Sequence, residues 1–403
     1  MERLNHGRLE NSLKELGKVG ATPGGGRTRL ALTDEDKAGR DLLCRWIREA
    51  GLELKVDAIG NIYGILPGPG GAVDSPVMSG SHIDTVRDAG MFDGCLGVLS
   101  ALECLRTVRE KGLPHKKPLA MAAFTNEEGA RFQPDMMGSL VAGGLEKLED
   151  IYASVDEKGC TVGEELERIG YRGTDTIRPS AFIEYHIEQG PLLHAQGIQI
   201  GSVTGIYGIN WWRGRFAGQP NHAGTTPMDM RRDALYGLSQ VHVRGTELAR
   251  RTGARFTIGR VNVAPGIPNV VPGTVDFTLD LRHADGPTLE HLNKAVVGIV
   301  NEVAAENGLE LELEQNVNAR PVAFDASLIA MVERHAAARG LSLMRLGSPA
   351  GQDAQMMANV APTTMIFVPS IGGLSHCPEE QTGWPDVAAG AEVLLDCLLE
   401  LAG

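Results

Sequence analysis

Two apolar stretches of this chain end abruptly in polar clusters, and this pattern strongly constrains the fold. One stretch covers residues 73–78 and leads to His82 and Asp84, and the other covers residues 118–124 and leads to Glu127 and Glu128. Short apolar runs bounded by polar residues predict buried strands. A buried charge costs several kcal/mol unless it is paired or bound to a metal. The pattern therefore indicates a divalent metal site where the strands end.

The spacing within the clusters predicts different roles for their members. Residues i and i+2 of an extended segment face the same side, so we expect Asp84 to stand beside His82. A carboxylate in that place can accept the spare ring N–H of a metal-bound histidine. Glu127 and Glu128 are adjacent and point apart, so one can bind metal while the other acts as a general base. Each side chain taken singly is equally well explained as a solvated loop residue.

Composition narrows the class of protein. A chain of 403 residues exceeds the usual size of a single hydrophobic core, so one large domain with an insertion is expected. The net charge of −13 disfavours a nucleic acid or an anionic membrane as partner. The first 18 residues are charged and lack the apolar core of a signal peptide, and no run reaches membrane-spanning length. These features predict a cytoplasmic protein.

Strands and helices alternate along the first half of the chain. The residue patterns predict helices over residues 34–50 and 96–108, and a hairpin over residues 52–66 that turns at Gly60 and Asn61. This alternation is typical of a three-layer α/β domain with a mostly parallel sheet. Ligands of such domains bind at the carboxyl ends of the strands, where both acidic clusters fall.

A different order of elements occupies the middle of the chain. Strands are predicted at residues 208–218, 254–263, 274–282 and 309–317, and helices at residues 228–251 and 285–307. The order βαββαβ is that of a ferredoxin-like unit. The first pattern then resumes with a helix over residues 326–339, a strand over 364–368 and a helix over 387–401. We therefore expect a discontinuous catalytic domain of residues 1–210 plus 325–403, and an inserted satellite domain of residues 211–324.

Two further histidines lie in contexts that suit a metal site. His186 follows the apolar segment that begins at Phe182, and His376 lies in a glycine-rich loop after the predicted strand 364–368. For either histidine alone, a purely structural hydrogen bond is the simpler interpretation.

A series of short motifs runs in order along nearly the whole chain: G-S-H-I-D-T-V, F-D-G, N-E-E-G-A-R-F, F-I-E-Y-H-I-E-Q-G-P, N-H-A-G-T-T-P-M, P-N-V-V-P-G, D-L-R-H and G-L-S-H. Together they resemble the amidase/hydantoinase–carbamoylase branch of the M20 metallopeptidase superfamily. That branch includes N-carbamoyl-L-amino-acid hydrolases, allantoate amidohydrolases and β-ureidopropionases. The E-x-H-I-E-Q-G-P and H-A-G-T-T-P-M types are specific to this branch.

The resemblance implies two divalent metal ions in each subunit. Asp93 would bridge the ions, His82 and His186 would complete one site, and Glu128 and His376 would complete the other. Histidine and carboxylate ligands suit zinc, which is the first choice, and also manganese, cobalt and nickel.

The resemblance also implies catalytic roles. Glu127 would take a proton from the bridging water and return it to the leaving nitrogen, and Asp84 would be the carboxylate partner of His82. His222 would donate to the tetrahedral oxyanion. Because members of the branch are dimers built through the satellite domain, His222 and Asn269 are expected to come from the partner subunit.

Four side chains are expected to bind substrate besides His222. Gln189, Asn269 and Arg282 resemble the family's substrate-binding groups, with Arg282 pairing with an α-carboxylate; a surface ion pair is the simpler alternative for Arg282. The family usually has A-G-H-D-A where this chain has A-G-Q-D-A, with Gln352 in the central place. Glutamine carries no charge and is a poor metal ligand, so a substrate contact is changed there.

These features predict a metal-dependent hydrolase of a linear C–N bond in an N-carbamoyl-L-amino acid or a related ureido acid such as allantoate. Two alternatives stay open. A hydrolase of N-acyl amino acids or dipeptides would belong to the same superfamily. A non-catalytic, metal-stabilised binding protein would have lost Glu127 or part of the ligand set, and the sequence retains both.

Overall fold

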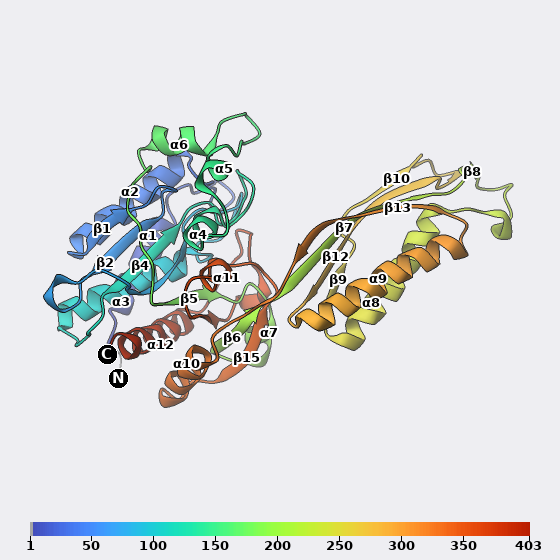
Figure 1. Ribbon diagram of the computed structural model, residues 1–403. Helices are drawn as coiled ribbons and strands as arrows, with labels where there is room; N and C mark the ends of the chain where they lie inside the picture. Colours follow the sequence, from blue (N-terminus) through green and yellow to red (C-terminus); the bar gives the residue numbers. More distant parts are fainter. Residues whose placement is uncertain (1–2) are drawn as a thin grey trace. The chain divides into compact units, whose positions relative to one another are not determined.

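The computed structural model describes residues 3–403, which form two compact units (Figure 1). The first unit comprises the residues up to Gly205 together with Phe324–Gly403, and the second is Ile206–Ala323. The first two residues of the charged N-terminal segment lie outside the described part. Within residues 3–403, no helix has the length and apolar character needed to cross a membrane.

A nine-stranded sheet contains the strands of the first unit and one two-residue strand from the last residues of the second unit. These strands are β1 (Glu53–Val56), β2 (Ile62–Leu66), β3 (Val77–His82), β4 (Leu119–Phe124), β5 (Ala181–Ile187), β6 (Ile200–Ile206), β14 (Val322–Ala323), β15 (Leu343–Ser348) and β16 (Thr363–Val368). Their order is β1-β2-β4-β3-β5-β16-β6-β14, with β15 beside β6. The four central strands β4, β3, β5 and β16 are parallel, and β2 and β6 flank them in the antiparallel sense. The fold is therefore a mixed α/β fold with a mostly parallel centre.

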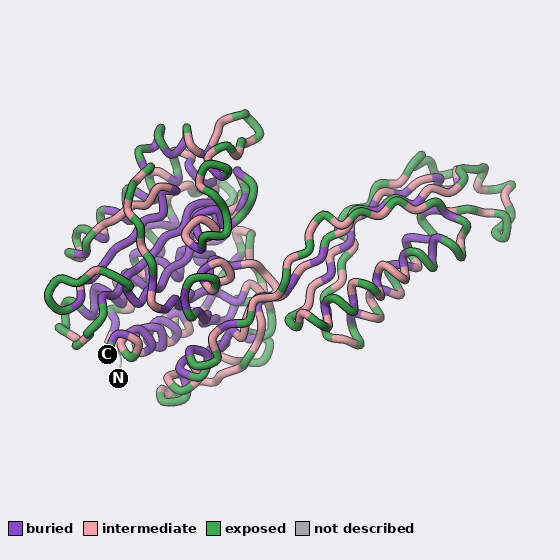
Figure 2. Tube along the Cα trace, viewed as in Figure 1, coloured by how far each residue is buried: buried purple, intermediate pink, exposed green. Residues whose placement is uncertain are grey.

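Helices cover this sheet. They are α1 (His6–Leu16), α2 (Asp34–Glu49), α3 (Cys95–Lys111), α4 (Met137–Ala142), α5 (Leu148–Tyr152), α6 (Val162–Ile169), α7 (Leu192–Gln196), α10 (Ala326–Ala338), α11 (Asp353–Met357) and α12 (Trp384–Ala402), with 3-10 turns at Pro69–Gly71 and Ile371–Gly373. α3 packs against α12 and against β3, and α4 packs against α11 and β4. Every residue of the four central strands is buried (Figure 2), so both faces of the sheet are covered.

Several elements of this unit confirm the predictions. α2 and α3 occupy the expected helical segments, and β1 and β2 form the expected hairpin. The Thr33 hydroxyl accepts the backbone N–H of Asp36 and so caps α2, which satisfies one of the free donors at its start. β3 begins at Val77, later than the apolar run suggested, because Ser75 has a positive φ of 51° and Pro76 lacks an N–H.

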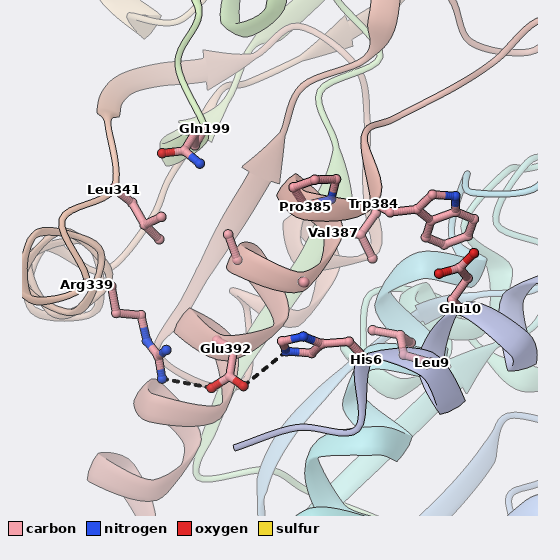
Figure 3. A pocket seen from close by; sticks show the side chains of 13 residues that line it. His6, Leu9, Glu10, Gln199, Arg339, Leu341, Trp384, Pro385, Val387 and Glu392 are labelled. Atoms are coloured by element: carbon pink, nitrogen blue, oxygen red, sulfur yellow. Dashed lines mark hydrogen bonds and ion pairs between the residues drawn. The ribbon is translucent and has the colours of Figure 1, made fainter. Parts of the chain in front are cut away.

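Glu392 in α12 attaches the N-terminal segment to the C-terminal helix. Its Oε1 accepts the backbone N–H groups of Arg3 at 2.6 Å and Leu4 at 2.8 Å, and its Oε2 accepts from Arg339 Nη2 at 2.9 Å. Figure 3 shows His6 and Arg339 on either side of this carboxylate, in the wall of a cavity of about 570 Å³. Burial opposes ionisation of Glu392, but these donors hold its pKa below the usual value.

The second unit consists of an antiparallel sheet and two long helices. Its elements are β7 (Gly208–Ala217), β8 (Asn221–His222), a 3-10 turn (Met228–Met230), α8 (Ala234–Thr252), β9 (Arg255–Thr257), β10 (Val261–Ala264), β11 (Val270–Val271), β12 (Thr274–His283), α9 (Gly286–Glu306) and β13 (Glu310–Ala319). The strand order is β10-β12-β7-β13, with β9 also beside β12 and with β8 and β11 paired separately. Buried and half-buried residues alternate along β12, so one face forms a core with α8 and α9.

Two expectations for this unit are corrected. The helix predicted from residue 228 begins at Ala234, because the Asp233 carboxylate accepts the N–H groups of Leu235 and Tyr236 and caps the helix there. The single strand predicted over residues 254–263 is divided into β9 and β10, and Gly259 lies in the break between them.

Candidate metal centre

The ends of adjacent parallel strands gather the polar side chains. His82 is the last residue of β3, Glu127 and Glu128 follow β4, and His186 lies near the end of β5. Because β4, β3 and β5 are neighbours and parallel, their carboxyl ends lie next to one another at the same end of the sheet. Asp93, two residues before the start of α3, belongs to the same cluster of side chains.

The five expected ligands form two groups that share one residue. His82, Asp93 and His186 form the first group, and Asp93, Glu128 and His376 form the second; within each group the ligand atoms all lie within 4.8 Å of one another. Asp93 Oδ1 lies 3.1 Å from His186 Nε2 and 3.7 Å from His82 Nε2. Asp93 Oδ2 lies 3.1 Å from His376 Nε2, which is 3.5 Å from Glu128 Oε2. Each Asp93 oxygen thus faces a different group.

Main-chain carbonyls set the tautomers of the two buried histidines. His82 Nδ1 lies 3.0 Å from the carbonyl oxygen of Asp84, and His186 Nδ1 lies 2.8 Å from that of Ile187. A carbonyl oxygen only accepts, so each Nδ1 carries a proton, and each Nε2, which faces Asp93, is the ring nitrogen left to bind a metal ion.

The carboxylate of Asp84 is not the hydrogen-bond partner of His82 that the spacing predicted. Its Oδ1 lies 3.9 Å from His82 Nδ1, too far for a hydrogen bond. The two Asp84 oxygens instead accept the backbone N–H groups of Glu127 at 3.2 Å and Glu128 at 3.3 Å. Asp84 therefore supports His82 through its main chain and the two glutamates through its side chain.

Glu127 and Glu128 diverge. Glu128 belongs to the second group, whereas Glu127 Oε2 approaches His82 Nε2 at 3.4 Å and joins neither group. Burial raises the pKa of Glu127 well above its usual value and raises the pKa of Glu128 to about 7. The two acids thus have distinct positions beside the same centre.

The electrostatics of the cluster suit a divalent cation. Burial opposes ionisation of Asp93, but hydrogen bonds from His186, His376 and His82 hold its pKa well below the usual range. The bond to Asp93 raises the pKa of His376 to about 9. A positive ion would replace the protons that these groups otherwise retain, because ligands bind metal in their deprotonated form. The nitrogen and carboxylate donor set therefore fits divalent metal binding.

The backbone around the cluster is unusual. Asn126, Gln189 and His376 have positive φ angles of 54°, 57° and 57° although none is glycine. Such conformations cost free energy and concentrate at functional sites. At Gly94, with φ 65°, an added Cβ would lie 2.5 Å from atoms of the His82 ring, so only glycine allows the approach.

Two expected substrate-binding glutamines form a chain that ends on Asp93. Gln189 Nε2 donates to Asp93 Oδ2 at 2.9 Å, and Gln352 Nε2 donates to Gln189 Oε1 at 2.8 Å. Both residues belong to the first unit, and Gln352 is buried.

The other three expected residues lie in the second unit. His222 on β8 pairs with Val270 on β11, and the carbonyl of the adjacent Asn269 accepts the N–H of Ala223 at 2.9 Å. His222 Nδ1 accepts the N–H of Gly224 at 3.0 Å, which leaves the proton of the neutral ring on Nε2.

Arg282, near the end of β12, donates to Asp280 Oδ2 from Nη2 at 2.7 Å. The guanidinium is about a quarter exposed, and so is its carboxylate partner. The side chain therefore makes an ion pair on the polar face of the strand.

Several supporting residues were not anticipated. Glu380 Oε1 accepts the N–H groups of Phe92 at 2.9 Å and Asp93 at 3.2 Å, and the Ser375 hydroxyl donates to Glu380 Oε2 at 2.9 Å. Glu184 accepts from the Ser81 hydroxyl at 2.7 Å beneath the cluster. Glu184 could have been found from the sequence, because it lies two residues before His186 and so faces the same side; no local signal marks Glu380.

Comparison with known proteins identifies the family. Residues 78–400 match the sequence profile of peptidase family M20/M25/M40. The chain belongs to this family. Its M20 relatives include N-carbamoyl-L-amino-acid amidohydrolase of Rhizobium meliloti, which is 41% identical over 99% of this chain and 97% of that protein. Allantoate amidohydrolase of Escherichia coli is 35% identical over 98% of this chain and 97% of that protein.

Solved structures agree with this assignment to the M20 family. A hydantoinase/carbamoylase family amidase from Burkholderia multivorans is 43% identical, and the match covers 99% of this chain and 98% of that one with a TM-score of 0.95. The resemblance inferred from the motifs is thus confirmed, and this M20 chain is similar to amidohydrolases over nearly its whole length.

Proposed function

We propose that this M20 protein is a metal-dependent amidohydrolase that cleaves a linear C–N bond in an N-carbamoyl-L-amino acid or a related ureido acid such as allantoate. The observation that carries the proposal is the position of Asp93. Each of its two carboxylate oxygens faces a different ligand group, and Glu127 lies beside these groups. The names of the Rhizobium and Escherichia relatives support the ureido class of substrate.

The described residues would hold two divalent ions. His82, Asp93 and His186 would bind one, and Asp93, Glu128 and His376 the other. When bound, such ions lower the pKa of a bound water and polarise the scissile carbonyl. Zinc is the first candidate, with manganese, cobalt and nickel as alternatives, because the donor set suits all four.

Glu127 is the proposed general base. It lies outside both ligand groups, so its carboxylate is available to take a proton from the attacking water and deliver it to the leaving nitrogen. Burial raises its pKa, which favours that return of the proton. The two backbone bonds from Glu127 and Glu128 to Asp84 hold the base and its neighbouring ligand in place.

Groups of the second unit are proposed to bind the substrate. His222, with its proton on Nε2, would donate to the oxyanion, and Asn269 lies beside it. Arg282 would pair with the substrate carboxylate through its planar guanidinium. Gln189 would contact the substrate from the first unit.

Strand β12 supports a homodimer. Arg282 lies near one end of β12, opposite Ile209 of β7. The other end of β12 begins at Thr274, opposite Ala217, and the paired strands β8 and β11 are next to these two residues in sequence. Eight residues of strand span about 26 Å. One small substrate cannot contact both His222 and Arg282 of the same chain, so we propose that one of them is supplied by a second copy.

We further propose roles for the two units. The first unit would be the catalytic domain, and the second would be the inserted satellite domain through which the dimer forms. The order βαββαβ and the strand arrangement β13-β7-β12, with β9 and β10 outermost, support a ferredoxin-like description.

A substrate panel tests the proposed function. Metal-depleted protein would be reconstituted with Zn²⁺, Mn²⁺, Co²⁺ or Ni²⁺ and assayed against N-carbamoyl-L-amino acids, allantoate, N-acyl amino acids and dipeptides. We expect kcat/KM to be highest for a member of the ureido class. Turnover confined to acyl or peptide substrates would contradict the proposal, and so would complete inactivity with all metals.

A further inference from the structure

The amide of Gln352 has one atom in a hydrogen bond and one atom buried without a partner. Gln352 is 2% exposed, its Nε2 donates to Gln189, and its Oε1 has no hydrogen-bond partner among the described residues. It occupies the N-cap position of α11, yet its side chain makes no capping bond there. A buried carbonyl oxygen without a donor costs free energy, so native proteins rarely leave one unpaired without a reason.

The direction of the hydrogen bonds fixes which atom of Gln352 stays free. The Asp93 carboxylate can only accept, so Gln189 must present its Nε2 to it, as the 2.9 Å contact shows. Gln189 therefore presents Oε1 to Gln352, which must donate from Nε2. The free side of Gln352 is consequently an acceptor, and a ligand group that meets it must be a donor.

This acceptor lies beside the proposed reaction centre. A single carboxamide, that of Gln189, separates Gln352 from Asp93, and Gln189 Nε2 also lies 3.4 Å from His376 Nε2. The backbone N–H of Gln189 donates to the Ser370 hydroxyl at 2.9 Å, which helps to hold Gln189 in its positive-φ conformation. The Gln352 amide is thus held in place by a constrained neighbouring side chain, and its free oxygen lies on the side opposite this bond.

We propose that Gln352 Oε1 accepts a hydrogen bond from the terminal amino group of a carbamoyl substrate and so selects ureido acids over N-acyl amino acids. This inference rests on the proposed function. A carbamoyl group carries NH₂ where an acetyl group carries a methyl and a formyl group carries a hydrogen atom. With either acyl substrate, Oε1 stays unpaired in a buried position, and a polar site discriminates strongly against an analogue that lacks its partner.

The test compares N-carbamoyl-L-alanine with N-formyl-L-alanine in the metal-loaded wild type and in Gln352→Met. Methionine has a similar length but no amide. We expect kcat/KM for the carbamoyl substrate to fall by about tenfold to a hundredfold, because the variant lacks the Oε1 acceptor and leaves the carbamoyl NH₂ without its hydrogen-bond partner. The value for the formyl substrate should change by less than about threefold, because that substrate makes no such bond.

Two controls separate specificity from general damage. Gln199→Met makes the same replacement at a half-buried glutamine in the wall of the cavity in Figure 3, and it should leave the ratio of the two kcat/KM values unchanged. Metal content and melting temperature of Gln352→Met should match those of the wild type. Equal losses for both substrates, or no loss, would overturn the role of Gln352.

A binding measurement keeps the inference testable if Gln352→Met does not fold. Calorimetry on Glu127→Gln, with Gln352 intact, should give a dissociation constant for N-carbamoyl-L-alanine at least about tenfold below that for N-acetyl-L-alanine. Equal affinities would overturn the inference. A wild type that hydrolyses no ureido acid contradicts the proposed function itself, whereas turnover of ureido acids with an unaltered carbamoyl-to-formyl ratio in Gln352→Met refutes only this role.

Discussion

Asp84 Oδ1 accepts the backbone N–H of Glu127 at 3.2 Å, and this bond joins the end of β3 to the residues that follow β4. Asp84 is 2% exposed, so the contact is shielded from water. The position of the proposed base is therefore set by the neighbouring strand as well as by its own. Because this bond uses the backbone of Glu127, a substitution of its side chain can remove the carboxylate without removing the bond.

Glu127→Gln should retain its fold and its metals but lose turnover by a factor of about 10² to 10⁴, because the base is removed and no ligand is. Glu128→Gln is the contrasting variant, since it alters a proposed ligand and should lower metal content. Stopped assays of kcat and elemental analysis measure the two effects. If Glu127→Gln kept more than a tenth of the wild-type kcat with metals bound, its role as base would be wrong.

Removal of metal should abolish activity, and Zn²⁺, Mn²⁺, Co²⁺ or Ni²⁺ should restore it. Chelation should proceed in two phases, because the His376 side chain is 49% exposed whereas that of His186 is fully buried. His376→Ala should leave about one ion per chain and eliminate the faster phase. Metal release followed with a chromogenic chelator gives the rates. Full activity of metal-free protein would refute the mechanism.

Arg282→Lys should raise KM for a free-carboxylate substrate about tenfold to a hundredfold with metal content unchanged, because lysine cannot reproduce a bidentate pair. Arg215→Lys is the matched control on the adjacent strand β7, where Arg215 pairs with Asp276 at 2.6 Å. It should leave KM unaltered. Amidated substrates should bind poorly to the wild type and no worse to Arg282→Lys. An unchanged KM in Arg282→Lys would assign the residue to its pair with Asp280 alone.

Metal affinity should rise with pH. In the metal-free protein the pKa of Glu128 is raised to about 7 and that of His376 to about 9, so both groups hold protons at pH values where their ordinary counterparts have released them. Metal must displace these protons. Calorimetric titration with Zn²⁺ in buffers of different ionisation enthalpy should show proton release that is large at pH 6 and small above pH 9. An affinity independent of pH across this range would contradict the proposed ligands.

The same shifts bear on the stability of metal-free protein. A His376 pKa raised in the folded state stabilises the fold at low pH, and this contribution is lost as pH rises from about 6.5 through about 9. The raised pKa of Glu128 acts in the same direction, between about 4.5 and about 7. Both contributions should be absent from the His376→Ala, Glu128→Ala double variant, which can be checked by urea unfolding at several pH values.

Two ion pairs of α2 share their spacing and differ in burial. Arg40 and Asp36 are 2.7 Å apart and buried, whereas Lys37 and Asp41 are 2.6 Å apart and exposed. Arg40→Ala should lower the free energy of unfolding by about 3–5 kcal/mol, because it leaves a buried carboxylate unpaired. Lys37→Ala should cost about 0.5 kcal/mol or less. Urea unfolding measures both, and similar values for the two would contradict the assigned role of burial.

The parts of the centre that could be predicted are those encoded by local pattern. His82, Glu127 and Glu128 follow apolar runs, so their position at strand ends could be inferred from the sequence. The contact between Asp93 and Glu380 could not be predicted, because 287 residues separate them and no local sequence pattern indicates such a contact.

Main-chain geometry explains the error over Asp84. The period of a strand placed its side chain near His82, but the chain leaves the strand at His82, and the turn that follows brings the Asp84 carbonyl to the ring instead. The start of α8 was misplaced for a related reason. Apolar spacing continued through Met228 and Met230, whereas the capping carboxylate of Asp233 determines where the helix begins.

The place of β16 in the sheet has a consequence for synthesis of the chain on the ribosome. β16 (Thr363–Val368) lies between β5 and β6, and Glu392 holds Arg3 and Leu4. The first unit therefore cannot close its sheet, or secure its first residues, until the last tenth of the chain is made. The second unit is continuous in sequence and has its own core, so it can fold before β16 has been added to the sheet of the first unit. Until β16 is made, the exposed strand edge of this sheet is open to pairing with other chains.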